Sequence, residues 1–177
     1  MNSVAAPATA ATGRVASAWE VLGTVLDPEV PALSVRDLGL VRDVQLDGEA
    51  LEIVLTPTYS GCPATEVIEQ SVLDAIGEAG LGPARVTLRR APAWTTDWIS
   101  AEGRDKLRAY GIAPPGPTHL YADGAVPIRF MPRTPPVACP RCASADTERL
   151  SAFGSTACKS LYRCRACREP FEHFKPI

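Results

Sequence analysis

Residues 139–167 read CPRCASADTERLSAFGSTACKSLYRCRAC, and this stretch decides how the end of the chain folds. It holds two CxxC turns separated by 21 residues. In a CxxC turn two sulfurs can point at one ion while backbone amides donate hydrogen bonds to them. Two such turns complete a tetrahedron, so we predict a structural Zn²⁺ held by Cys139, Cys142, Cys164 and Cys167 in a small ribbon.

Other uses of these four thiols stay open. Four thiolates also suit iron or an iron–sulfur cluster, and a disulfide pairing without metal is a further alternative. The predicted ribbon, residues 138–177, is too short to build a sufficient core. We therefore expect the metal to supply much of its folding energy, which is roughly 10–16 kcal/mol in small zinc domains.

Two more side chains near the CxxC turns are candidates for a role in metal binding or transfer. Cys158 lies too far along the chain from either turn to be an ordinary ligand. It is either a small core residue or a secondary thiol for transient metal transfer or a partner contact, with Lys159 favouring its thiolate. His173 is a candidate spare ligand, although a lone histidine is more often a polar surface group.

Composition and charge limit the classes of function. The chain has 177 residues, 46% hydrophobic and 21% charged, which suits one core and a small satellite domain. Residues 1–138 carry 11 basic and 16 acidic side chains (−5) and residues 139–177 carry 7 and 4 (+3), which sum to the formal charge of −2. Four thiolates around a divalent ion contribute about −2, so the basic end is poor evidence for nucleic acid.

The sequence also indicates where the protein works. No apolar run approaches the roughly 18 residues that span a bilayer, and residues 1–13 lack the pattern of a secretion signal. Six cysteines in mostly CxxC spacing and no export signal favour a reducing cytoplasm. We expect no membrane partner.

The part of the chain before the ribbon alternates helical and strand patterns. Apolar residues three or four apart predict a helix over 14–26, and a second helix is expected over 64–79. Alternation on both sides of Asp47 and Gly48 predicts a β-hairpin over 40–55. A third strand over 85–90 would join it in parallel by a right-handed crossover, and a last helix is expected over 101–110. The class is α/β.

Proline content divides the chain further. Eight of the seventeen prolines lie between Gly111 and Pro140, which is typical of a stiff extended connector. We predict a disordered leader over 1–13, an α/β domain over 14–112, a Pro-rich linker over 113–137 and the zinc ribbon over 138–177.

Cys62 is the one cysteine outside the ribbon, and it falls just before the second predicted helix. Backbone N–H groups and the helix dipole at such a position stabilise a thiolate. It is therefore either an exposed, reactive or metal-touching thiol or a buried structural one. Asp27 and Glu29, on either side of a proline, could bind a cation or cap a helix, and the alternative is a solvated pair.

Several motifs together resemble a known family. Residues 27–29 (DPE), 37–41 (DLGLV) and 56–63 (TPTYSGCP) are similar to the MIP18 (DUF59) family of iron–sulfur assembly factors. Residues 92–99 (PAWTTDWI) and 153–164 (FGSTACKSLYRC) narrow the resemblance to the D-component family of the phenylacetyl-CoA epoxidases. This implies a small MIP18-like α-β-β-α-β-α domain followed by the ribbon.

The resemblance also implies a function in aerobic phenylacetate degradation. Such subunits are non-catalytic accessory components, thought to assemble an iron–sulfur cluster or iron centre of the reductase or oxygenase. By this likeness Cys62, Asp27 and Glu29 are the residues for transient iron or cluster transfer, and the partners are the oxygenase and reductase subunits, with a homodimer a further candidate. A purely structural subunit and, less favoured, a nucleic-acid-binding zinc ribbon are the alternatives.

Overall fold

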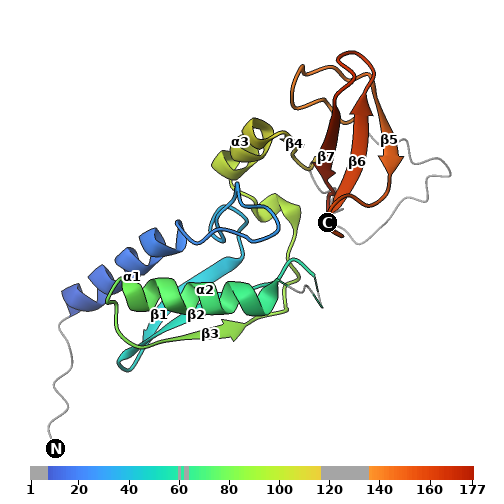
Figure 1. The fold of residues 1–177 in the computed structure, drawn as a ribbon. Coiled ribbons are helices and arrows are strands. Elements are labelled where there is room, and N and C mark those ends of the chain that lie inside the picture. The colour runs from blue at the N-terminus through green and yellow to red at the C-terminus, as the bar shows by residue number, and fades with distance from the viewer. Residues whose placement is uncertain (1–7, 60, 62–63, 117–135) are drawn as a thin grey trace, which may run out of the picture. The chain divides into compact units, whose positions relative to one another are not determined.

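The computed structural model describes residues 8–59, 61, 64–116 and 136–177, with side chains from residue 12 (Figure 1). Cys62 and most of the predicted linker lie outside the described residues. Two compact units divide the chain: one holds residues up to Trp94 together with Trp98–Gly103, and the other holds Thr95–Asp97 and Arg104–Ile177.

The first unit is built on a three-stranded sheet in the order β1-β2-β3. Strands β1 (Val41–Asp47) and β2 (Ala50–Leu55) form the predicted antiparallel hairpin, and Gly48 at its turn has φ +61°. Strand β3 (Ala84–Leu88) pairs in parallel with β2. The sheet therefore has the hairpin and the crossover expected from the sequence.

Both helices of this unit, α1 (Ala8–Leu22) and α2 (Thr65–Glu78), cover one face of the sheet (Figure 1), since α1 contacts β1, α2 contacts β3, and the helices contact each other. Buried side chains from all three elements fill the space between, including Leu22, Ile53 and Val72. On the opposite face Glu52 accepts hydrogen bonds from Gln45 and Thr87. That face is polar around Glu52, whereas Val54, also on that face, is buried.

Two helix predictions need correction. The first helix runs from Ala8 to Leu22 rather than over 14–26, because Gly23 N–H donates to the carbonyls of both Trp19 and Glu20 and closes the last turn. Leu26, expected on its apolar face, is 53% exposed. In α2 the apolar spacing of Val67, Ile68 and Val72 predicts that all three are buried, yet Val67 is also 53% exposed. Gly80 has φ +65°, as a helix-ending glycine should.

The segment after β3 is held against the loop that precedes β1. The indole Nε1 of Trp94 donates to the carbonyl of Leu38 (2.9 Å), and the N–H of Ser100 donates to the carbonyl of Asp37 (2.9 Å). A short 3₁₀ turn, η1 (Thr96–Trp98), and helix α3 (Ala101–Tyr110) follow. Ser100 Oγ accepts from Gly103 N–H at 2.9 Å and caps α3.

The second unit is a four-stranded sheet in the order β4-β7-β6-β5. Strands β5 (Thr147–Ser151), β6 (Lys159–Cys164) and β7 (Pro170–Phe174) are antiparallel neighbours and form the ribbon. Strand β4 (Ile112–Ala113) pairs in parallel with β7, which the sequence did not predict. Among the described residues no helix is long and apolar enough to cross a membrane.

Candidate metal centre

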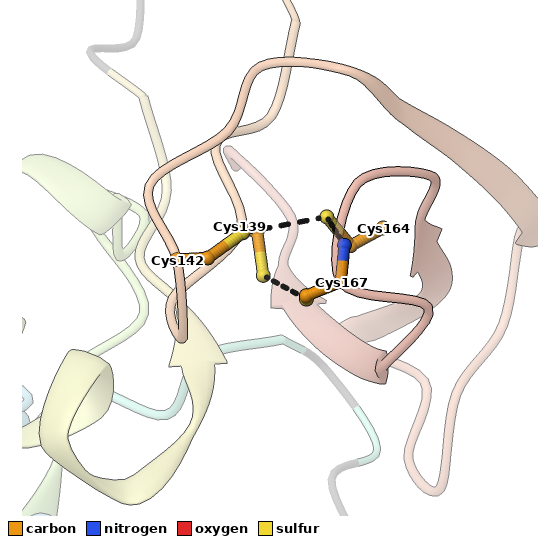
Figure 2. Close-up of side chains that lie close together, drawn as sticks. All are labelled: Cys139, Cys142, Cys164 and Cys167. Carbon is orange, nitrogen blue, oxygen red and sulfur yellow. Dashed lines mark hydrogen bonds between the residues drawn. The ribbon is translucent and has the colours of Figure 1, made fainter.

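The four predicted cysteines meet in one place. Their Sγ atoms all lie within 4.8 Å of one another, with Cys139 and Cys167 3.8 Å apart and Cys142 and Cys164 3.6 Å apart. Figure 2 shows one pair reaching in from the loop before β5 and the other from the turn between β6 and β7. The two CxxC turns therefore converge as the spacing predicts, and the zinc that they would hold stays a prediction.

The two turns share two backbone features. In each, the N–H of the first cysteine donates to a carbonyl five residues on: Cys139 to Ser144 and Cys164 to Glu169. The residue after the second cysteine has a positive φ in both, +61° at Ala143 and +68° at Arg168. Repetition of one turn on opposite sides of the site directs two sulfurs from each side to a common centre.

The spacing of the sulfurs fits a single tetrahedral ion. A metal–sulfur bond of about 2.3 Å gives a tetrahedron with sulfur–sulfur edges of about 3.8 Å, and the two shortest separations are 3.6 and 3.8 Å. A disulfide would bring a pair to about 2.05 Å. A multi-iron cluster places extra atoms between the thiolates and requires wider spacing. The geometry therefore fits one metal ion better than a disulfide or a multi-iron cluster.

The thiols ionise unequally when no cation is present. The backbone N–H of Cys167 donates to Cys164 Sγ at 3.4 Å and lowers the pKa of Cys164 to about 7. For Cys167 itself, a hydrogen bond from the backbone of Glu169 favours the thiolate, but burial and the neighbouring sulfurs outweigh it and raise its pKa to about 12. A divalent ion would offset the repulsion between neighbouring thiolates. Metal binding would therefore release protons from the cysteine thiols.

Two basic side chains near the site, Arg163 and Arg165, are paired with acidic ones. The guanidinium of Arg163 contacts Glu148, and that of Arg165 contacts both Glu148 (3.0 Å) and Asp146 (3.8 Å). The Arg163 and Arg165 hydrogen bonds lower the pKa of Glu148. These acidic partners leave a smaller positive field for a polyanion than the sequence count alone indicates.

Neither additional candidate of the ribbon joins the four ligands. Cys158 is buried, with its Sγ 3.0 Å from Thr156 Oγ1, and Lys159 forms an ion pair with Glu172 (3.0 Å). His173 is buried on β7, with Nδ1 3.4 Å from Ser160 Oγ. The described His, Cys, Asp and Glu side chains form one group that could hold an ion, and it excludes these residues.

The predicted transfer residues are only partly described. Asp27 is buried, and its Oδ1 accepts hydrogen bonds from the N–H groups of Glu29 (2.9 Å) and Val30 (2.8 Å), so one role of its carboxylate is to fix this loop. Glu29 is half-buried. Cys62 lies outside the described residues, and its relation to Asp27 and Glu29 stays a prediction.

Sequence reasoning missed two features that the site uses. Glu172 accepts the N–H of Ser155 at 2.6 Å as well as pairing with Lys159, and so fixes the loop that begins at Phe153. Ala113, far upstream of the ribbon, lies in the same buried cluster as Cys139 and Cys164. In the sequence Glu172 has the pattern of an ordinary strand residue. The residues around Ala113 show no alternation that would predict a strand of the ribbon.

Comparison with known proteins finds a family match for each half of the chain. Residues 16–88 match the family described as iron–sulfur cluster assembly protein, and residues 127–175 match the PaaD zinc beta ribbon domain. A protein of Escherichia coli (strain K12), provisionally named as the D component of 1,2-phenylacetyl-CoA epoxidase, is 48% identical over 170 residues, covering 96% of this chain and 98% of that protein. A DUF59 domain of unknown function from Bacillus anthracis superposes with a TM-score of 0.53 at 25% identity, covering 57% of this chain and 97% of that one.

Proposed function

Because the chain belongs to the PaaD family of phenylacetyl-CoA epoxidase components, which joins an iron–sulfur assembly domain to a zinc ribbon, we propose that it is a non-catalytic accessory subunit of such an epoxidase system. Its role would be assembly of the iron–sulfur cluster or iron centre of the reductase or oxygenase. The observation that carries this proposal is the near full-length match to a member of that family.

The ribbon would hold Zn²⁺ as a structural ion. Four cysteine sulfurs in a closed set leave no open position for a substrate, as is usual for structural rather than catalytic zinc. Zinc has no redox chemistry, so its bound form would leave the protein colourless. One zinc per chain and no visible absorption support this assignment, whereas strong visible absorption with bound iron would contradict it.

Metal transfer would belong to the first unit, with Cys62 offering a thiolate and Asp27 and Glu29 supplying the acidic surroundings. Buried Asp27 holds the backbone at Glu29 and Val30, so it would set the position of the Glu29 carboxylate as well as adding charge. A thiolate and carboxylates are suitable ligands for iron that must bind and leave again.

The test of this role is Cys62→Ser, with Cys158→Ser as the matched control, because both remove one thiol that is not a ribbon ligand. Each variant is produced together with the oxygenase and reductase subunits. We expect Cys62→Ser to lower the iron and acid-labile sulfide of the client about tenfold or more, with binding to the client unchanged. Unchanged metal in the client would favour a purely structural role.

The ribbon would dock the client protein, and its best contact point is Phe153. This side chain is 65% exposed, yet its loop is fixed by Glu172, and Lys175 Nζ lies 4.5 Å from the ring centroid. An aromatic side chain on an ordered loop loses little conformational entropy on binding, which suits an interface anchor.

We expect Phe153→Ala to weaken binding of the client about 30-fold, as loss of about 2 kcal/mol at an interface anchor would. Tyr110→Ala is the control, since Tyr110 is an equally large aromatic with 55% exposure in the same unit. Titration of the purified client by calorimetry measures both. Equal affinities of the two variants would remove Phe153 from the interface.

A further inference from the structure

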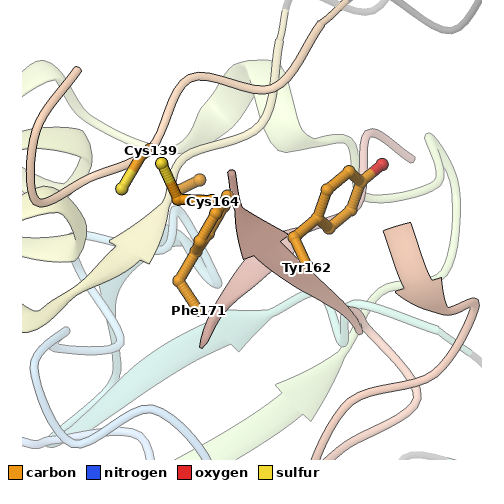
Figure 3. Packing of buried hydrophobic residues seen from close by; sticks show 5 residues of the cluster. Cys139, Tyr162, Cys164 and Phe171 are labelled. Atoms are coloured by element: carbon orange, nitrogen blue, oxygen red, sulfur yellow. The ribbon is translucent and has the colours of Figure 1, made fainter. Parts of the chain in front are cut away.

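Two of the ribbon's metal ligands are part of a hydrophobic core that includes a residue from outside the ribbon. Cys139 and Cys164, 2% and 0% exposed, pack with Tyr162 and Phe171 (Figure 3). Ala113 of β4 completes this cluster, with 2% exposure. The side chains that hold the metal therefore also bury a residue that precedes the ribbon sequence.

Pairing with β7 also holds β4 in place. Ile112 and Ala113 pair in parallel with Glu172 and His173 of β7. A two-residue strand has no stability of its own and depends on the sheet it joins. If β7 loses its place, β4 loses its hydrogen-bonding partner.

The first CxxC turn adds a contact at the other end of β4. Arg141, between the two cysteines, lies so close to Gly111 that a Cβ added there would be 2.7 Å from its Nη2. Gly111 also has φ +96°, which a side chain would disfavour. The turn that supplies Cys139 and Cys142 thus packs directly on the residue before β4.

The contacts continue upstream within the same unit. The guanidinium of Arg104 donates to the carbonyls of Pro115 (2.7 Å) and Thr96 (2.8 Å). Thr96, fully buried, exchanges hydrogen bonds with the backbone of Ile177. Residues 95–97 and 104–115 therefore belong structurally to the metal-binding unit, although neither family match includes them.

We infer that metal at the four cysteines acts as a latch on residues 104–115: occupancy holds β4 and the end of α3 in place, and loss of metal releases them. The physical reason is that the ribbon is too small to keep its core without the ion, and β4 has no other sheet to join among the described residues. The latch rests on metal occupancy of the site but not on which client the protein serves.

Hydrogen–deuterium exchange of the full chain, with bound zinc and after removal of zinc by a chelator, tests the latch. We expect amides of 104–113 to lose protection at least tenfold together with those of β6 and β7. Amides of β1 and β2 should change less than twofold. The latch is overturned if 104–113 stay protected while β6 and β7 open, if the ribbon stays protected without metal, or if β1 and β2 open as well.

A reciprocal test uses the linkage between the two events, because a segment that metal orders must in turn strengthen metal binding. Ala113→Asp places a charge in the buried cluster, and Ala157→Asp, at an exposed alanine of the same unit, is the control. Competition with a chromogenic chelator should show about tenfold weaker zinc binding for Ala113→Asp only. Equal affinities would overturn the latch, and the zinc content of the wild type in the same assay shows separately whether the metal assignment holds.

Discussion

His173 lies inside the second unit with 7% of its surface exposed, edge-on to the Tyr162 ring at 5.5 Å between centroids. Burial lowers its pKa from 6.5 to about 4. In the unfolded chain the imidazole takes up a proton below about pH 6.5, whereas in the folded chain it does so only near pH 4. The unfolded state therefore binds more protons in this window, and stability falls as the pH drops through it.

From these values we expect the free energy of unfolding of this unit to fall by about 2 kcal/mol between pH 6.5 and pH 5, at about 1.4 kcal/mol per pH unit. His173→Gln keeps a polar side chain but does not titrate, so it should lack this part of the slope. Denaturant unfolding at several pH values measures both proteins at verified, equal zinc content, because acid also weakens thiolate–metal bonds. Parallel slopes would show that His173 is already protonated or exposed.

At the scale of elements, Gly39 allows the loop before β1 to meet the segment after β3. A Cβ added at Gly39 would lie 2.5 Å from the carbonyl oxygen of Trp98 and 2.8 Å from its Cβ, and φ is +67°. Gly48 has a similar φ of +61° but open space around it. Comparing substitutions at Gly39 and Gly48 therefore separates the free-energy cost of the positive φ from that of the steric clash.

We expect Gly39→Ala to destabilise the first unit by about 3 kcal/mol, from overpacking plus the backbone angle, and Gly48→Ala by about 1 kcal/mol from the angle alone. Tryptophan fluorescence in denaturant is a suitable probe, since Trp19, Trp94 and Trp98, the three tryptophans of the chain, all lie in this unit. Equal losses in the two variants would mean that the loop shifts to admit the methyl group.

Local patterns predict much of the fold, and the limits of that prediction are physical. Alternation around Asp47 and Gly48 predicts β1 and β2 because the turn and the pairing are close in sequence. The CxxC spacing predicts the metal site because each turn is built from neighbouring residues. Strand β4 is missed because two residues show no periodicity, and its pairing with β7 depends on contacts far along the chain.

The apolar spacing likewise does not predict correctly which apolar residues at the helix ends are buried. Leu26 continues the apolar spacing of α1, yet the helix has already ended at Leu22. Val67 lies in the first turn of α2, where the periodic stripe predicts burial but the helix leaves it exposed. Such differences arise at element ends, where capping decides where the repeat stops.

At the scale of the whole molecule, two units with separate cores should unfold separately. Zinc that binds only the folded second unit stabilises that unit by mass action, so each tenfold rise in free zinc above the dissociation constant adds about 1.4 kcal/mol there. For a unit of this size the midpoint should rise by about 5–10 °C. The tryptophan-bearing first unit should not respond, because it holds none of the four ligands.

Calorimetry in zinc buffers, with tryptophan fluorescence recorded on the same samples, distinguishes the two transitions. Cys142→Ser removes one ligand, so its second-unit transition should shrink or disappear at every zinc concentration while the fluorescence transition stays where it is. A single transition that moves as a whole with zinc would contradict independent units. It would mean instead that the ion's binding free energy reaches the first sheet, and that the chain folds as one cooperative body despite its two cores.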